Sequence, residues 1–104
     1  MTRDERALAI MEDRKLVLGV LNLRYPNYVA GDTVYKTVLG LSTEFTRRRL
    51  LRDLTYLCDK GYVKFKGLHG IEAMSLTTTD CAFALTAHGF DVANRLTVDP
   101  TLDV

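Results

Sequence analysis

Four arginines lie close together near the middle of the chain, Arg47, Arg48, Arg49 and Arg52. Leucines in the same segment recur at three- and four-residue spacings, so a helix there would have an apolar face and a cationic face. Residues 36–66 contain eight basic and three acidic residues, although the net charge of the whole chain is only +1. Positive charge gathered in one segment favours binding of a phosphate-bearing polyanion. The alternative is a solvated helix surface with no ligand.

Other kinds of chemistry receive little support from the sequence. Cys58 and Cys81 are not closely spaced with each other or with His69 and His88, whereas zinc ligands usually come in pairs a few residues apart. Both cysteines are expected on inward faces, as reduced core thiols. The sequence contains no glycine-rich phosphate loop, nucleophile elbow or HExxH motif. We therefore predict no enzyme activity, no metal site and no cofactor.

The chain length indicates a single domain. With 104 residues the chain is large enough for one hydrophobic core and too short for two. We expect one domain over residues 1–96 and a tail over residues 97–104. The sequence has no apolar run long enough to cross a membrane and no secretory leader. A cytoplasmic protein without membrane contact is the expectation.

A long first helix is predicted at the start of the chain. Thr2 and Glu5 match the reciprocal capping pattern, and the apolar periodicity runs to about Leu23 before Pro26 ends the helix. Residues 27–31 are expected to form a turn. The charged first half of the helix is expected to extend beyond the core, either as a dimer contact or as a solvated extension.

Two further helices follow with the spacing of a helix-turn-helix. Asp32 is expected to cap a short helix over residues 33–39. Residues 40–42, Gly-Leu-Ser, then form a tight turn. The basic segment forms the next helix over residues 43–60, and Gly61 supplies a left-handed stop.

Two strands and a loop are predicted after this basic helix. The strands cover residues 62–66 and 81–85, in which apolar residues alternate with other types. Alternation in the first strand places Tyr62 and both lysines on the solvated face. Residues 67–80 form the long hairpin loop between the strands.

Thr86 is expected to cap a last helix over residues 87–96. The predicted fold is α+β and mainly α, with three helices, a two-stranded hairpin and a C-terminal helix. This order resembles the winged helix-turn-helix domains of transcription regulators, in particular small bacterial and phage proteins of MarR-, PadR- and ArsR-like type. Residues 50–63, LLRDLTYLCDKGYV, resemble the leucine-rich recognition helix that leads into the first wing strand. Residues 83–96, FALTAHGFDVANRL, resemble the L-T-x-x-G entry into the helix after the second wing strand.

The resemblance implies a double-stranded DNA-binding transcriptional regulator, expected to be a repressor, with residues 43–60 in the major groove. Arginine reads guanine well because its planar fork matches two acceptors of the base. The base-reading residues implied by position are Thr43, Thr46, Arg47, Arg48 and Arg49. The residues implied to contact phosphates, and so to position the protein without reading sequence, are Thr33, Lys36, Thr37, Arg52, Lys64 and Lys66.

Two departures from the family pattern leave a second interpretation open. The wing, residues 67–80, contains no arginine or lysine, so minor-groove reading by the wing is not expected. Dimerisation helices have no counterpart after residue 96, so a homodimer would form through the first helix, the wing or the tail. The alternative function is a winged-helix protein–protein interaction module that does not bind DNA.

Overall fold

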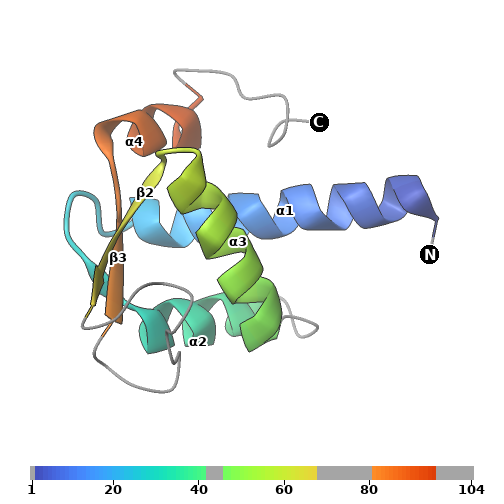
Figure 1. Ribbon diagram of the computed structural model, residues 1–104, viewed down its shortest axis with the longest axis horizontal. Helices are drawn as coiled ribbons and strands as arrows, with labels where there is room; N and C mark the ends of the chain where they lie inside the picture. The colour runs from blue at the N-terminus through green and yellow to red at the C-terminus, as the bar shows by residue number, and fades with distance from the viewer. Residues whose placement is uncertain (1, 42–45, 68–80, 96–104) are drawn as a thin grey trace.

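A computed structural model describes residues 2–41, 46–67 and 81–95 of the chain. The described ranges are mainly helical with a small antiparallel sheet (Figure 1), which confirms the expected α+β, mainly α class. The elements in chain order are α1 (Arg3–Asn22), β1 (Val29–Ala30), α2 (Gly31–Leu41), α3 (Arg47–Asp59), β2 (Val63–Gly67), β3 (Cys81–Leu85) and α4 (Ala87–Ala93).

The sheet has three strands in the order β1-β3-β2, where two strands were expected. β3 is central: Phe83 is opposite Val29 on one side and opposite Phe65 on the other. The turn predicted at residues 27–31 was therefore wrong in part, because Val29 and Ala30 pair with β3. A strand of two residues is too short to give a periodic signal in the sequence.

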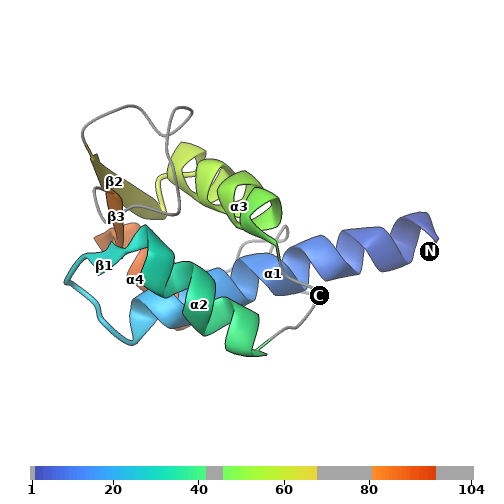
Figure 2. The same cartoon turned by 90° about the horizontal axis from the view of Figure 1, so that it is seen from below.

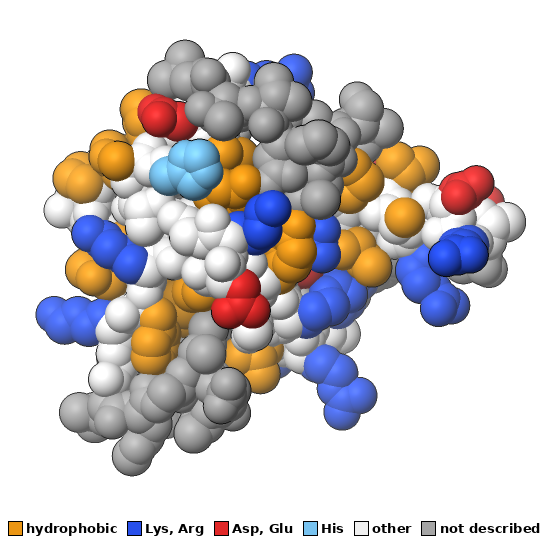
Figure 3. Space-filling view, turned by 45° about the horizontal axis from the view of Figure 1, so that its top comes forward, with side chains coloured by type: hydrophobic (Ala, Val, Ile, Leu, Met, Phe, Trp, Pro, Cys, Tyr) orange, Lys and Arg blue, Asp and Glu red, His pale blue; other side chains and the backbone are white. Residues whose placement is uncertain are grey.

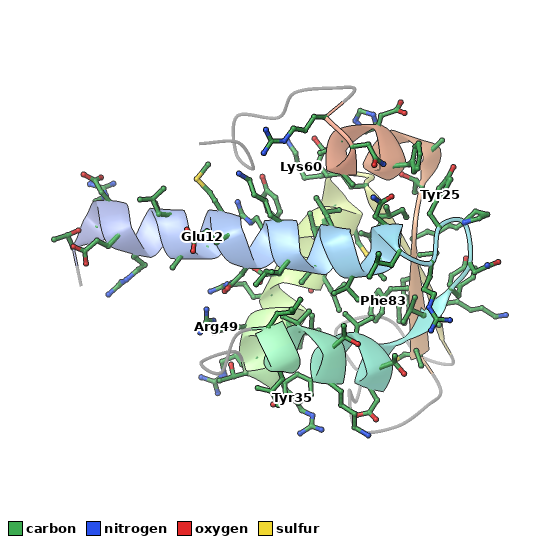
Figure 4. The ribbon with its side chains drawn as sticks, turned by 180° about the vertical axis from the view of Figure 1, so that it is seen from behind. Glu12, Tyr25, Tyr35, Arg49, Lys60 and Phe83 are labelled. Carbon is green, nitrogen blue, oxygen red and sulfur yellow. The ribbon has the colours of Figure 1, made fainter. Side chains whose placement is uncertain are left out.

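The core lies between the sheet and the helices. α1 runs through the middle of the fold, with α3 crossing on one side (Figures 1 and 2). Phe83 projects from the sheet toward α1 and α2 (Figure 4) and is fully buried. The predicted apolar stripe of α3 is confirmed, since Leu50, Leu54 and Leu57 are all fully buried.

The helix ends follow the expected capping chemistry in most places. Thr2 and Glu5 form the reciprocal capping box at the start of α1. Thr86 caps α4 by accepting a hydrogen bond from the backbone N–H of Gly89. Gly61 has a φ of +79°, so the predicted left-handed stop after α3 is confirmed. These ends are confirmed because capping depends on residues close in sequence.

Four boundaries differ from the predictions. α2 ends at Leu41 rather than at residue 39, so Gly40 and Leu41, predicted to lie in the turn at residues 40–42, belong to the helix. α2 begins at Gly31, so Asp32 lies inside the first turn instead of capping it, where its negative charge still suits the helix dipole. α3 begins at Arg47 with Thr46 as its cap, so Thr46 precedes the helix rather than lying within it. α4 ends at Ala93, earlier than predicted, and Leu96 lies outside the described residues.

Tyr62 is the clearest error in the predicted strand. It was placed on the solvated face with the lysines, but it precedes β2 and its exposed fraction is only 5%. Its backbone N–H donates to the carbonyl of Leu57, which ties this N–H to the end of α3. Predictions for Thr43, the wing tip at residues 68–80 and the tail at 97–104 lie outside the described residues.

Candidate nucleic-acid interface

The first turn of α3 presents the exposed part of the predicted cationic face. Thr46 begins this turn, and its side-chain oxygen accepts a hydrogen bond from the backbone N–H of Arg49 at 3.2 Å. Arg47 and Arg48 follow, both exposed, and Arg48 forms no ion pair with a described carboxylate. The helix dipole is already positive at this end, so cations here do not help the helix form. They do strengthen a potential that attracts anions.

Side chains of α2 lie beside this turn. The guanidinium carbon of Arg47 is 4.4 Å from the ring centroid of Tyr35, which Figure 4 labels on α2. Asp32 forms an ion pair on each side, with Lys36 Nζ at 2.9 Å and with Arg47 Nη2 at 3.7 Å. The Lys36 side chain is 71% exposed and that of Arg47 is 46% exposed. The structure thus brings Lys36 and Arg47 together around one carboxylate, which orients them and offsets part of their charge.

Arg49 and Arg52 are held by carboxylates of the protein itself. Arg49, which Figure 4 labels, donates from Nε at 3.0 Å and from Nη2 at 2.8 Å to Oδ2 of Asp13 on α1. Arg52 donates from Nη2 to the same oxygen at 3.0 Å and from Nε to Asp53 at 3.0 Å. Two residues expected to contact DNA therefore belong to an α1–α3 ionic cluster made of Asp13, Arg49, Arg52 and Asp53.

Burial sets the electrostatics of this ionic cluster. The Asp53 side chain is fully buried and that of Asp13 is 5% exposed. Burial raises the pKa of the Asp53 carboxyl, and the hydrogen bond from Arg52 only partly offsets this effect. Burial also acts to lower the pKa of Arg52, but its contacts with Asp53 and Asp13 raise it overall. Buried charges of this kind are tolerated because they are paired.

Sequence reasoning missed both acidic members of the cluster, although a signal was present. Asp53 lies within the apolar stripe of α3, between Leu50 and Leu54. Asp13 lies one helical turn before Val17, which belongs to the core-facing stripe of α1. An acidic residue inside an apolar stripe predicts a buried partner of opposite charge.

Lys64 and Lys66 lie on the outer face of the sheet. Their ammonium nitrogens are 5.4 and 5.7 Å from the ring centroid of Tyr28, which is 43% exposed. Tyr28 immediately precedes β1, the strand that the sequence did not reveal, and so its part in this group was missed as well. The two lysines are available to solvent, as the alternation predicted.

The two threonines of α2 are exposed, and Thr37 does not extend the group around Asp32. The hydroxyl of Thr37 donates to the carbonyl of Thr33 at 2.7 Å. Thr37 also lines a groove between α1 and α2, together with Leu16 and Leu41. Its side chain therefore faces α1 rather than Arg47.

The predicted contacts thus form separate groups rather than one continuous surface. We refer to Lys36, Arg47 and Arg48 as the α2–α3 basic group. On the face shown in Figure 3, basic side chains are likewise separated by hydrophobic, polar and acidic ones. Comparisons with models of protein families, with curated proteins and with solved structures found no match. None of the helices in the described ranges combines the length and the hydropathy that a membrane span requires.

The described ranges contain no arrangement of side chains suited to metal binding or thiol chemistry. No group of three or more histidine, cysteine or acidic side chains there could hold a metal ion. Cys81 is buried as expected, whereas Cys58 is only half-buried. Burial, and to a smaller extent the charge of Asp59, raises the pKa of the Cys58 thiol from 9.0 to about 11. The reactive thiolate form of Cys58 is therefore scarce at neutral pH.

This pKa makes a direct prediction for thiol labelling. A shift from 9.0 to about 11 lowers the thiolate fraction at pH 8 about 100-fold, so alkylation of native Cys58 should be slower than in the denatured chain by up to about that factor. The measurement is iodoacetamide labelling followed by peptide mass spectrometry, with and without denaturant. The native rate should rise about tenfold per pH unit up to the pKa. Equal native and denatured rates at pH 8 would contradict the assignment.

Proposed function

We propose that this chain is a winged helix-turn-helix protein that binds double-stranded DNA and regulates transcription, with α3 as its recognition helix. The observation that carries the proposal is the α2–α3 basic group: exposed cations at the start of an amphipathic helix, next to the helix that precedes it. Such an N-terminal turn is the part of a recognition helix that contacts base edges. We assign base reading to Arg47 and Arg48, and a phosphate contact to Lys36.

The order of the elements supports this assignment. α2 and α3 are consecutive helices, and α3 leads through Gly61 into an antiparallel strand pair. In a winged helix, that strand pair places basic side chains over the phosphate backbone beside the recognition helix. Lys64 and Lys66 are exposed on the strand that follows α3, and so we assign them to phosphates.

Arg49 and Arg52 receive a different role in this proposal. Both donate to Asp13 of α1, so each guanidinium is held by a carboxylate within the protein. We infer that they fix the orientation of α3 on α1 and act as positioning residues. Arg48 and Arg49 are then neighbours of the same type with different functions.

The test is a DNA-binding titration with paired variants. In vitro selection from a random duplex library supplies a preferred site, and fluorescence anisotropy measures affinity across a salt series. We expect affinity to fall steeply with salt because bound phosphates release counterions. Arg48→Ala should weaken binding to the selected site by about tenfold or more. Lys36→Ala should reduce the steepness of log affinity plotted against log salt concentration by about 1. It should also weaken binding to all DNA sequences alike.

Arg95→Ala is the matched control, since it removes the same charge. Arg95 follows α4, at the end of the molecule opposite the first turn of α3 (Figure 1), and its loss should leave affinity within about twofold, as long-range effects are screened by salt. If Arg48→Ala and Arg95→Ala weaken binding equally, only non-specific charge attraction is present and the assignment is wrong.

A second function is favoured by the separation of the cations into groups. Asp32 offsets part of the charge of Lys36 and Arg47, and a strongly basic footprint is the usual feature of a DNA-binding surface. The alternative is a winged-helix protein–protein interaction module. Absence of DNA binding at low salt, with native circular dichroism retained, would select this alternative.

A further inference from the structure

α1 is longer than the core requires. Its 20 residues correspond to a helix of about 30 Å, and its first turns extend away from the other described elements (Figures 1 and 2). The side chains of residues 2–8 are exposed, among them Leu8, a large apolar residue that is 39% exposed. A helix of this length with an apolar side chain on its overhang has more contact surface than the single chain uses.

The opposite end of α1 carries an apolar groove. The groove lies between α1 and α2 and has a volume of about 530 Å³. Two of its apolar side chains are strongly exposed, Leu23 at 80% and Leu41 at 64%. Figure 4 shows α1 and α2 side by side in front of α3. The residues of α1 that line the groove are Glu12, Lys15, Leu16, Gly19, Val20 and Leu23.

Leu8 lies on the same face of α1 as this groove. Glu12 is one turn after Leu8, and Lys15 and Gly19 are two and three turns after it, so these four positions form one row along the helix. The row reads apolar, acidic, basic, glycine. It ends in the groove, where Gly19 leaves an opening in the helix surface.

We propose that the groove binds a second copy of this chain, with the two α1 helices antiparallel about a two-fold axis. In this arrangement Leu8 of each chain enters the groove over the partner subunit's Gly19. Glu12 of each chain forms an ion pair with the partner subunit's Lys15. The contact is isologous, since each chain contributes the same leucine, the same groove and the same charged side chains.

Charge complementarity selects a second copy over another partner. Two antiparallel helices related by a two-fold axis pair residues whose numbers have a constant sum. The register that sets Glu12 opposite Lys15 therefore also sets Leu8 opposite Gly19. One register satisfies both the ion pairs and the contact of Leu8 with Gly19, and it uses only residues on this face of α1.

Gly19 supports the proposed dimer contact independently. Glycine in the middle of a helix is unfavourable compared with alanine. No internal packing requires it, because a Cβ at residue 19 would meet no atom within 4 Å in the described structure. A glycine is explained if another helix approaches closely at this point, as in the proposed contact with Leu8.

The test measures self-association without DNA, so its outcome is independent of the proposed function. Sedimentation equilibrium of the full chain should show a concentration-dependent dimer. Leu8→Asp should raise the dimer dissociation constant by about tenfold or more, because it places a charge in an apolar groove. Glu12→Lys and Lys15→Glu should each weaken the dimer, and the double charge swap should restore it. Circular dichroism checks the fold of every variant.

Cysteine cross-linking tests the register of the two helices, and its positive result is the appearance of a cross-linked dimer. Under mild oxidation, the double variant with Leu8→Cys and Gly19→Cys should form a disulfide-linked dimer. Either single variant should not, because two copies of residue 8, or of residue 19, would be eleven positions apart, about 16 Å along the helices, beyond the reach of a disulfide. The wild-type chain, with Cys58 and Cys81, is the background control.

Two results would overturn the proposal. One is a wild-type chain that stays monomeric over the whole concentration range. The other is a dimer that is insensitive to Leu8→Asp and to the charge reversals, with no cross-link in the double cysteine variant. The second result would mean that the chain associates through another face and that the groove has a different occupant.

Discussion

Gly89→Ala is expected to cost about 3 kcal/mol of the free energy of unfolding, because the added methyl group would overlap backbone atoms. A Cβ at this position would collide with the carbonyl oxygen of Tyr62 and lie 2.7 Å from its carbonyl carbon. Neither atom is the end of a flexible side chain, so the backbone itself would have to shift. For a domain of this size the melting temperature should fall by about 12 °C or more.

Hydrogen bonds around Gly89 prevent an easy adjustment. The backbone N–H of Thr86 donates to the same Tyr62 carbonyl at 3.0 Å, and the Thr86 hydroxyl donates to the carbonyl of Gly61 at 2.6 Å. The hydroxyl also accepts from the backbone N–H of Gly89 at 3.0 Å. Moving α4 away from Tyr62 would break the two bonds that Thr86 donates to the carbonyls of Tyr62 and Gly61.

Gly40→Ala is the matched control for Gly89→Ala. Gly40 is also a helical glycine, but a Cβ there would meet no atom within 4 Å. The substitution should leave stability unchanged or raise it by up to about 1 kcal/mol, because alanine is the better helix former. Urea denaturation followed by circular dichroism gives both values. Similar losses of stability in the two variants would show that the close approach of Gly89 to the backbone of Tyr62 does not affect the free energy of unfolding.

The sequence allowed the local structure to be predicted because capping and periodicity depend on neighbouring residues. Thr2, Thr86 and Gly61 all have their expected roles. The L-T-x-x-G pattern also gains a physical explanation, since its threonine and glycine fasten α4 to the turn before β2. The two-residue strand β1 and the burial of Tyr62 depend on tertiary contacts, and no local pattern reports them.

The candidate interface was predicted less well for a related reason. A run of basic residues shows where charge lies along a helix, but it does not reveal which charges have partners within the protein. Arg48 and Arg49 look alike in the sequence, yet successive residues of a helix point about 100° apart. One is exposed, and the other meets a carboxylate 36 positions earlier in the chain.

The ionic cluster has a consequence for the proposed DNA-binding geometry. Asp13 accepts from two arginines that are nearly one turn apart on α3, so it restrains both the position and the rotation of α3 relative to α1. Base reading requires a recognition helix that is held in place, because a bidentate contact with a base tolerates little misalignment. The buried ionic cluster between α1 and α3 is thus consistent with a role in orienting α3, and not with a role in stability alone.

Asp13→Ala is expected to reduce the free energy of unfolding by about 3 kcal/mol, because it leaves part-buried guanidinium groups without their carboxylate. Arg49→Ala should cost a similar amount, since it leaves Asp13, only 5% exposed, with Arg52 as its remaining cation. The double variant should cost much less than the two single losses together, with a coupling energy of about 2 kcal/mol in a double-mutant cycle. Urea denaturation measures all three.

Arg48→Ala is the control within the same helix turn, and its stability should stay within about 0.5 kcal/mol of the wild type. The two neighbouring arginines should therefore separate two properties: Arg48→Ala reduces DNA affinity at unchanged stability, and Arg49→Ala reduces stability first. Additive losses for Asp13→Ala and Arg49→Ala would show that the cluster does not couple α1 to α3. In that case Arg49 would return to the set of residues available to DNA, and the proposed division of roles along α3 would be wrong.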